Sequence, residues 1–278
     1  MIFTESKRAN INRNSSKGNQ LKWVDEEKWY KADNLGYEAL SEYVISKLLV
    51  QTTVPEFADY TLEKMTYEGR VFTGCASKSF LEPGYAIITL SKLFQSYRNE
   101  NISVKCAHME NVQERVKYVV DAVVEITHLV DFGRYLTLLL EMDAFFLNDD
   151  RHFNNIAVLY NEEKNEFKYC PVFDNGSALF SDMTMDFPLD MDYEACIKHI
   201  QAKPFDRSFD EQMEAAEALY GIQFYFWFDR KAVEDVLCGA GELYDEQVIA
   251  RVFQVLKEQM RIYGCFRRTT AEEKKRYQ

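Results

Sequence analysis

The stretch from Phe145 to Phe180 constrains the fold of this chain more than any other. It reads FFLNDDRHFNNIAVLYNEEKNEFKYCPVFDNGSALF. An Asp-Arg-His-x-x-Asn run occupies Asp150–Asn155, and an Asp-x-Gly follows at Asp174–Gly176. Polar residues are therefore concentrated at the two ends of an otherwise apolar segment, which indicates one site assembled from both ends.

The residues between these two motifs predict a β-hairpin. Ile156–Tyr160 and Phe167–Phe173 are apolar and rich in β-forming residues, and they flank the polar turn segment NEEKNE. Pro171 predicts that the second run is an edge strand or is bulged there. A hairpin returns the chain to its starting end, so we expect Asn155 and Asp174 to lie close together.

Three oxygen-bearing side chains in this arrangement suit phosphoryl transfer. That chemistry needs a carboxylate near the attacking hydroxyl and separate oxygen ligands for magnesium. Asp150 is the candidate for the first task, and Asn155 and Asp174 are candidates for the second, because Mg²⁺ prefers carboxylate and amide oxygens. Asp149 competes with Asp150, but only Asp150 has the Asp-to-Asn offset of a protein-kinase catalytic loop.

The strings Asp-Arg-His-Phe-Asn-Asn and Phe-Asp-Asn-Gly, with the hairpin between them, resemble the bacterial HipA-like serine/threonine kinases, especially their short CtkA-like branch. The Asp-Arg-His-x-x-Asn string also resembles the catalytic loop of phosphatidylinositol 3- and 4-kinases. The resemblance implies an α+β, two-lobed protein-kinase-like fold that uses ATP and Mg²⁺. A small antiparallel-sheet lobe would cover residues 1–80, and a larger, mainly helical catalytic lobe would cover 81–278.

Two residues of the loop have alternative roles. In phosphatidylinositol-kinase-like sites, the histidine that corresponds to His152 is functional. In HipA-like and protein kinases, the corresponding His or Arg of the loop mostly braces the backbone. An imidazole suits either role near neutral pH. Arg151 carries a fixed charge and would either brace the loop or hold a phosphate.

The N-terminal part predicts an anchor for the nucleotide phosphates. LKWV and KWYKAD surround a DEE turn and predict a hairpin that carries Lys31, followed by a helix over Gly36–Val50. Glu38 and Glu42 are the carboxylates of that helix and lie on one face. The HipA-like pattern favours Glu42 as the ion-pair partner of Lys31; ordinary surface charges are the alternative.

Nucleotide contacts are also expected elsewhere in the first 81 residues. Gly18, within SSKGN, suits a loop that wraps phosphates, although a polar N-terminal tail explains the same residues. Autophosphorylation is expected in the Ser15–Ser16 part of this loop. Strand order and the resemblance place the adenine ring against backbone groups of Ser79, Phe80 and Leu81.

The rest of the chain predicts helices. Helical apolar spacing covers Glu110–Leu129 and Gly133–Leu147, and further helices are expected at Tyr193–Gln201, Asp210–Leu219, Arg230–Cys238 and Tyr244–Tyr263. Asp143, inside an apolar helix, is expected to be a hydrogen-bonded structural carboxylate. The FYFWF cluster at Phe224–Phe228 is expected in the core.

Composition excludes several classes of protein. A net charge of −12 and a pI near 5.0 oppose nucleic-acid binding. Six scattered cysteines without a C-x-x-C pair favour a reduced compartment. No run is long and apolar enough for a transmembrane segment, and the N-terminus lacks a signal-peptide core. We expect a cytoplasmic protein, with non-classical secretion as an effector left open.

These observations predict an ATP-dependent serine/threonine kinase that phosphorylates a protein hydroxyl and itself. An antitoxin-like or host protein partner is compatible with that class. Two alternatives remain: a phosphoinositide or other small-molecule kinase, and a nucleotide-binding pseudokinase effector.

Overall fold

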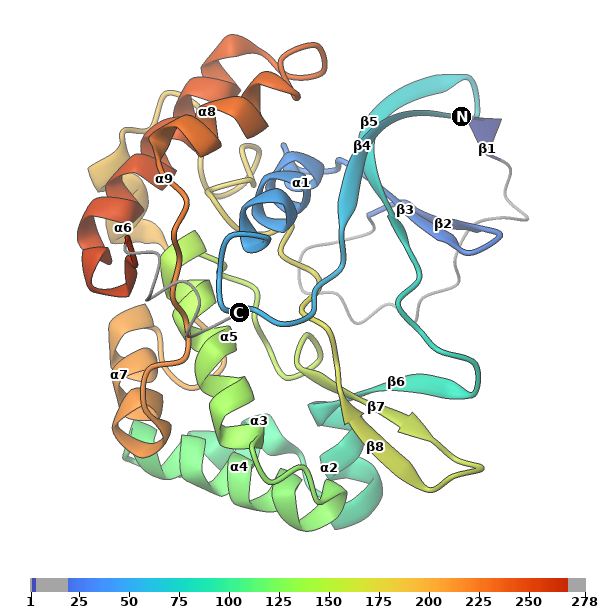
Figure 1. The fold of residues 1–278 in the computed structure, drawn as a ribbon, viewed down its shortest axis with the longest axis vertical. Helices are drawn as coiled ribbons and strands as arrows, with labels where there is room; N and C mark the ends of the chain where they lie inside the picture. The colour runs from blue at the N-terminus through green and yellow to red at the C-terminus, as the bar shows by residue number, and fades with distance from the viewer. Residues whose placement is uncertain (1, 4–19, 270–278) are drawn as a thin grey trace.

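The computed structural model describes residues 2–3 and 20–269 and contains two β-sheets and a set of helices (Figure 1). Within the described residues, the larger sheet has five strands in the order β1-β4-β5-β3-β2. The strands are β1 (Ile2–Phe3), β2 (Lys22–Asp25), β3 (Lys28–Ala32), β4 (Tyr60–Tyr67) and β5 (Arg70–Lys78). Helix α1 (Glu38–Leu49) lies between β3 and β4 in the chain.

The predicted hairpin that carries Lys31 is confirmed. Strands β2 and β3 pair antiparallel with Lys22 opposite Lys31, and Glu26 in the turn has a φ of 55°. The sheet is antiparallel, as expected, in its β2–β3, β3–β5 and β4–β5 pairs, but β1 pairs parallel to β4 at one edge. Two residues, Ile2 and Phe3, form this strand, and a run so short has no readable alternation in the sequence.

The second sheet contains the predicted hairpin. Its strands, in the order β6-β7-β8, are β6 (Tyr85–Thr89), β7 (Ala157–Asn161) and β8 (Glu166–Tyr169). Strand β8 is an edge strand and ends before Pro171, as that proline predicted. Figure 1 shows this sheet below the larger one, with the segment 79–84 connecting the two.

The later helices follow the predicted positions, with boundaries that differ by a few residues, whereas α2 (Leu90–Arg98) and α3 (Ile102–Ala107) were not predicted. The later helices are α4 (Val112–Thr127), α5 (Phe132–Phe146), α6 (Tyr193–His199), α7 (Phe209–Tyr220), α8 (Arg230–Cys238) and α9 (Glu246–Ile262). Asn111 and Ser208 cap α4 and α7 by accepting backbone N–H hydrogen bonds at the helix N-termini. A short 3₁₀ turn, η2 (Gly264–Phe266), follows α9.

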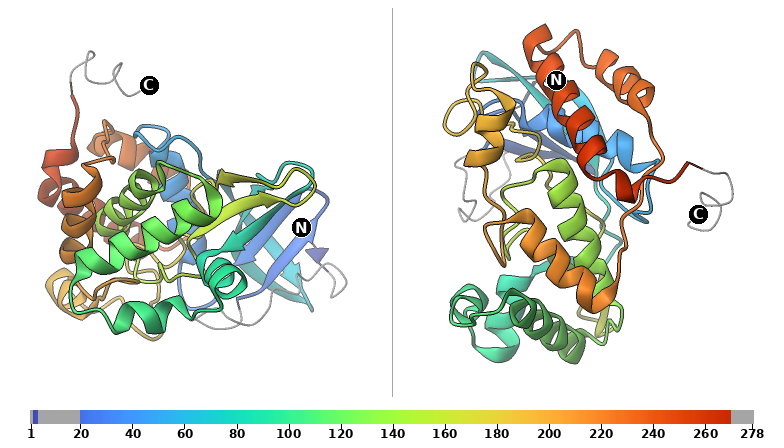
Figure 2. Two further views of the ribbon diagram at one scale, coloured as in Figure 1. Left: turned by 90° about the horizontal axis from the view of Figure 1, so that it is seen from below. Right: turned by 90° about the vertical axis from the view of Figure 1, so that its left-hand side faces the viewer.

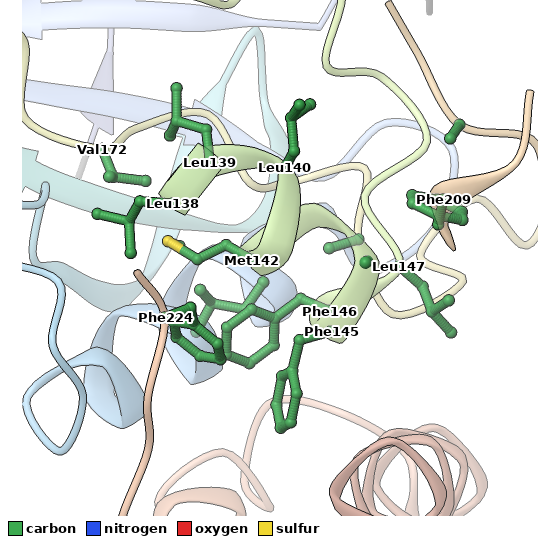
Figure 3. Packing of buried hydrophobic residues seen from close by; sticks show 14 of the residues in the cluster. Leu138, Leu139, Leu140, Met142, Phe145, Phe146, Leu147, Val172, Phe209 and Phe224 are labelled. Carbon is green, nitrogen blue, oxygen red and sulfur yellow. The ribbon is translucent and has the colours of Figure 1, made fainter. Parts of the chain in front are cut away.

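Helix α5 is the centre of the helical part. It packs against α4, α7 and α9, and Figure 2 shows α4, α5 and α7 side by side. Phe145 lies 4.9 Å from Phe226 and 5.4 Å from Phe224, measured between ring centroids. Figure 3 shows Phe145, Phe146 and Phe224 gathered around the end of α5. The FYFWF cluster is therefore core, as predicted.

The largest buried cluster joins α1 to these helices. Leu40, Val44 and Leu48 of α1 are fully buried in the same cluster as Leu136 and Leu140 of α5. Helix α1 also contacts α8 on one side and strands β4 and β5 on the other. The division of the chain at residue 80 stays a prediction, and the apolar core extends across it.

The sequence also led to expectations about the cysteines and about a transmembrane segment. All six cysteines are free thiols, and four of them are buried. None of the helices among residues 20–269 is long and apolar enough to cross a membrane.

Candidate active site

A pocket between the larger sheet, α1 and the loop after α5 collects half of the predicted site residues. Its lining includes Glu42 of α1, the loop residues Asp150, His152 and Asn155, and Asp174. The hairpin β7–β8 starts after Asn155 and returns the chain to Asp174, as the sequence predicted. Among the described residues, Asp150 and not the competing Asp149 lines the pocket.

Lys31 connects the two sides of this pocket. Its ammonium lies 2.5 Å from Glu42 Oε1 and 2.7 Å from Asp174 Oδ1. Burial lowers the pKa of Lys31, but the charges of Asp174 and Glu42 outweigh it and raise the pKa well above its ordinary value. The lysine is therefore a fixed cation that holds β3, α1 and the Asp-x-Gly turn together.

The backbone at Asp174 is turned into an unusual conformation. Its φ is 61°, in the left-handed region where Asp is tolerated better than most residues. The next N–H, of Asn175, donates to Glu42 Oε2 at 2.9 Å. Burial raises the pKa of Asp174, but the charges of Lys31 and then Lys22 outweigh burial and lower the pKa below its ordinary value. This carboxyl therefore stays ionised. Glu42 thus binds both Lys31 and the turn that carries Asp174.

Arg151 braces the loop from beneath, which decides between its two predicted roles. It is buried and donates from Nε and Nη2 to the carboxylate of Asp143 on α5 at 2.9–3.1 Å. Nη1 donates to the carbonyls of Asn155 and Phe173, and Nη2 donates to Asn175 Oδ1 at 2.7 Å. Asp143 is therefore structural, as predicted, and one guanidinium fixes both ends of the hairpin.

Asn175 occupies the position of the Phe in an Asp-Phe-Gly motif. Its side chain accepts from Arg151, and its backbone N–H donates to Glu42. The bond from Arg151 requires a side chain with an oxygen acceptor, and Phe has none, whereas the bond to Glu42 uses the backbone alone. The side chain of Asn175 therefore adds a buried polar link between the Asp-x-Gly turn and the loop.

The backbone of the loop orients the two polar side chains expected to do chemistry. The N–H of Asp150 donates to Asn148 Oδ1 at 3.3 Å, while its carbonyl accepts from Asn155 Nδ2 at 2.8 Å. Because the amide nitrogen of Asn155 is engaged in this way, its Oδ1 is the atom left to act as a ligand.

His152 combines bracing contacts with exposure to the pocket. Its Nδ1 accepts from the N–H of Asn154 at 3.2 Å, and its carbonyl accepts from the N–H of Asn155 at 2.7 Å. Its Nε2 lies 3.9 Å from Asp150 Oδ2. The bracing role is present in the structure, and the second ring nitrogen faces the carboxylate of Asp150.

The choice between Glu38 and Glu42 is resolved by their partners. Glu38 accepts backbone N–H groups of Asn34, Leu35 and Gly36 at 2.7–3.1 Å and so closes the turn before α1. Glu42, one helical turn later, reaches Lys31. Both lie on one face, as the spacing predicted. Glu38 stabilises the turn before α1, and Glu42 binds the lysine of the site.

The predicted adenine contacts lie in the connection between the two sheets. The N–H of Ser79 donates to the carbonyl of Glu27 at 2.7 Å, and the N–H of Leu81 donates to Ser79 Oγ at 3.3 Å. The ring of Phe80 packs 5.9 Å from that of Phe173, just before Asp174. Their contact with adenine stays a prediction. Gly18 and Ser15–Ser16 lie outside the described residues.

Two lysines at the site were not predicted. Lys203, in the loop between α6 and α7, places its Nζ 3.0 Å from Asp150 Oδ1. Lys22 lines the pocket on β2. Register could have found Lys22, because residues directly opposite in an antiparallel pair share a face and Lys22 pairs with Lys31. No spacing rule relates Lys203 to Asp150.

The pocket is rich in carboxylates. Its lining includes those of Glu38, Glu42, Asp150, Asp174 and Asp182. Among residues 2–3 and 20–269, no group of three or more His, Cys, Asp or Glu side chains has the arrangement of a metal cluster. Any metal would therefore need ligands besides these carboxylates, such as amide oxygens, water or a bound phosphate.

Comparison with known proteins shows the fold. No protein-family model matches the sequence, and no curated protein sequence does. The chain is similar to the crystal structure of a Helicobacter pylori proinflammatory kinase, CtkA, with a TM-score of 0.62 and 15% sequence identity. The similarity covers 94% of this chain and 95% of that one. The α+β architecture is therefore kinase-like over nearly the whole chain.

Proposed function

We propose that this chain is an ATP-dependent protein serine/threonine kinase that uses Mg²⁺ and phosphorylates itself as well as a protein substrate. One observation carries the proposal: Lys31 binds both Glu42 and Asp174 at the pocket that Asp150 and Asn155 line. These residues come from a strand, a helix, a loop and a turn far apart in the sequence. The kinase-like fold supports the same conclusion.

The chain's own residues suit the steps of the reaction. Lys31, held by Glu42, would pair with the nonreacting phosphates of ATP. Asp150 would orient the acceptor hydroxyl and receive its proton. The hydroxyl oxygen then forms a bond to the terminal phosphorus, while the bond from that phosphorus to the bridging oxygen breaks and ADP leaves. Arg151 takes no part in these steps because all its contacts are structural.

Magnesium fits the donor set of the pocket. Asn155 Oδ1 and the carboxylate of Asp174 are hard oxygen donors, and phosphate oxygens and water would complete the coordination. A bound Mg²⁺ would neutralise phosphate charge during transfer. The pocket needs this neutralisation, because its carboxylates would otherwise repel a triphosphate.

A two-lobed arrangement belongs to the same proposal. Residues 1–80 would form the nucleotide-binding lobe, residues 81–278 would form the catalytic lobe, and the adenine ring would bind near Ser79, Phe80 and Leu81. The segment 79–84 between the two sheets supports this division. Gly18 would belong to the phosphate loop.

Transfer of labelled phosphate tests the function. The purified protein is incubated with labelled ATP and Mg²⁺, a mixture of proteins rich in Ser and Thr, and vesicles containing phosphatidylinositol. We expect label on protein hydroxyls and on the chain itself, and none after chelation of Mg²⁺. Asp150→Asn should lower the rate by about 10²–10⁴-fold, because a general base contributes that much.

A matched control separates loss of the base from loss of charge. Asp190→Asn removes an exposed carboxylate after the Asp-x-Gly turn and should leave the rate unchanged. Equal rates for Asp150→Asn and the wild type would contradict the assignment of the base. Label confined to lipid would instead identify a phosphoinositide kinase. ATP binding without transfer to any acceptor would identify a nucleotide-binding pseudokinase.

A further inference from the structure

The carboxylate of Asp150 has a cationic neighbour that the proposed mechanism has not used. Lys203 Nζ lies 3.0 Å from Asp150 Oδ1, and the two residues are 53 positions apart. The side chain of Lys203 is 41% exposed, whereas that of Asp150 is 10% exposed. The ammonium therefore reaches the carboxylate from the open side of the loop.

The segment around Lys203 is fixed by three hydrogen bonds and one ring contact. Buried Gln212 of α7 donates to the carbonyl of Lys203 at 3.0 Å and accepts from the N–H of Phe205 at 3.2 Å. Arg115 of α4 donates to the carbonyl of Phe205 at 2.6 Å. The ring of Phe205 packs edge-on against Phe153 in the catalytic loop, 5.4 Å between centroids. The lysine thus projects from a rigid platform, which favours a positional role.

Holding the loop in place does not require Lys203. The backbone of Asp150 is already held by Asn148 and Asn155, and the loop beneath it is held by Arg151. A half-exposed ion pair also contributes little to stability. The contact is therefore with the reacting carboxylate itself and not with the framework around it.

Distances within a kinase site place the lysine near the transferred group. A general base lies about 2.6–3.2 Å from the hydroxyl whose proton it accepts. That hydroxyl must approach the phosphorus to about 3–3.5 Å. An ammonium 3.0 Å from the same carboxylate is therefore within reach of the terminal phosphate oxygens. A lysine is a compact charge on a flexible stem and can bridge both anions.

We propose that Lys203 is a catalytic residue of this site, which positions Asp150 and contacts the terminal phosphoryl group of bound ATP. This inference rests on the proposed kinase function. It assigns to the loop between α6 and α7 a role that supplements the Asp150–Asn155 motif. Lys203 would stabilise the charge that develops on the transferred group, while Lys31 pairs with the nonreacting phosphates.

Binding of two nucleotides that differ by one phosphate tests the inference apart from activity. Calorimetry compares the affinity for Mg²⁺ with ADP and for Mg²⁺ with a nonhydrolysable ATP analogue. Lys203→Met should weaken binding of the analogue by about 10- to 100-fold, the range expected for a hydrogen bond to a charged group. Its affinity for ADP should stay within about twofold, and Lys203→Arg should restore part of the loss.

Kinetics and a matched control complete the test. Arg207→Met removes a positive charge from the same loop, where its side chain is exposed, and should change neither affinity nor rate. Lys203→Met should lower kcat by about 10²-fold or more with a smaller effect on the KM for the protein acceptor. Its melting temperature without nucleotide should stay within about 3 °C of the wild type.

The outcomes are distinct. Equal losses of affinity for ADP and for the analogue, or no loss for either, would overturn the role of Lys203 while the kinase function stands. A wild-type protein that binds neither nucleotide and transfers no phosphate would overturn the kinase function and this inference together.

Discussion

Two residues at this site are in energetically unfavourable states that need stabilising partners. Asp174 has a left-handed backbone, and Arg151 is a buried charge. Each is stabilised by several partners: Lys31 on the side chain of Asp174, Glu42 on the amide after it, and Asp143 on the guanidinium. Strained or buried groups held by many bonds often mark functional positions. Together these bonds hold Asp174 at the pocket that Asn155 also lines.

A second buried carboxyl makes stability depend on pH. Glu141 of α5 is fully buried and accepts the N–H groups of Gln223 at 3.1 Å and Phe224 at 2.7 Å. Burial, together with neighbouring Glu217, raises the pKa of Glu141 to about 9 despite those bonds. Glu217 has a buried oxygen, Oε1, that has no other hydrogen-bond donor among the described residues. A protonated Glu141 supplies that donor. The raised pKa keeps Glu141 protonated at neutral pH.

The raised pKa predicts loss of stability at alkaline pH. The folded protein binds the proton more tightly than the unfolded chain, so the contribution is full below about pH 4.5 and is lost as pH rises towards 9. Glu141→Gln keeps an acceptor for both amides and supplies an N–H donor to Glu217. We expect this variant to be more stable than the wild type at pH 9 in urea unfolding, and to have a flatter pH dependence above pH 5.

The control for this prediction is Glu211→Gln, which removes an exposed carboxylate of α7. It should leave the pH dependence of unfolding as in the wild type. The same slope for Glu141→Gln and the wild type between pH 5 and 9 would show that Glu141 is ionised in the folded protein.

At the scale of elements, α1 is positioned by the segment that follows the Asp-x-Gly turn. Tyr37 Oη donates to the carbonyl of Leu179 at 2.7 Å, and Ser41 Oγ donates to that of Ala178 at 3.0 Å. The N–H of Tyr37 donates to the carbonyl of Ser181 at 3.1 Å. These bonds hold the helix so that Glu42 reaches Lys31. The short segment therefore serves as a support for α1.

Gly36 permits this close approach, and replacing it tests the support. A Cβ at Gly36 would lie 2.0 Å from the carbonyl oxygen of Ser181 and 2.9 Å from the N–H of Met183. Gly36→Ala should destabilise the fold by about 1–3 kcal/mol, as overpacking does. It should also weaken nucleotide binding measured by calorimetry, because α1 would shift away from Lys31.

Gly264→Ala is the matched control, because a Cβ there meets nothing within 4 Å. It should retain both stability and nucleotide affinity. Wild-type values of both quantities for Gly36→Ala would mean that the contact between α1 and the following segment is dispensable.

At the scale of the whole molecule, the sheet and the helices share one core. The apolar face of α1 is buried in the main cluster with α5. A polar link adds to it, since Asp33 at the end of β3 accepts from Tyr244 Oη and from the N–H of Ala39, both at 2.7 Å. Neither part can unfold without exposing apolar surface of the other, so folding should be cooperative across residue 80.

Two tryptophans allow this cooperativity to be measured. Trp23 lies in β2, and Trp227 lies in the helical part. One variant keeps Trp23, the other keeps Trp227, and Trp29 of β3 is replaced in both. The two variants should show coincident urea transitions, and Leu48→Ala should shift both by about 2–5 kcal/mol, as expected for a buried leucine. Separate midpoints for Trp23 and Trp227 would show two independent folding units.

The sequence predicted those parts of the site that are close to one another along the chain. Asp150, Asn155 and Asp174 are joined by a single hairpin, so spacing and turn residues sufficed to bring them together. The pairing of Lys31 with Glu42 needed in addition the resemblance to HipA-like kinases, because spacing alone left Glu38 as an alternative. Lys203 could not be predicted, because its position depends on how α7 and Phe205 pack against the loop. The parallel pairing of β1 depends in the same way on tertiary contacts.

The shared core also limits how such a protein can be rearranged in evolution or by design. Helix α1 is encoded with the sheet, yet it buries one side against α8. A recombination event near residue 80 would separate α1 from the surface that receives it. Chimeric proteins would therefore be expected to fold only when the donor of the helical part also provides a groove complementary to α1.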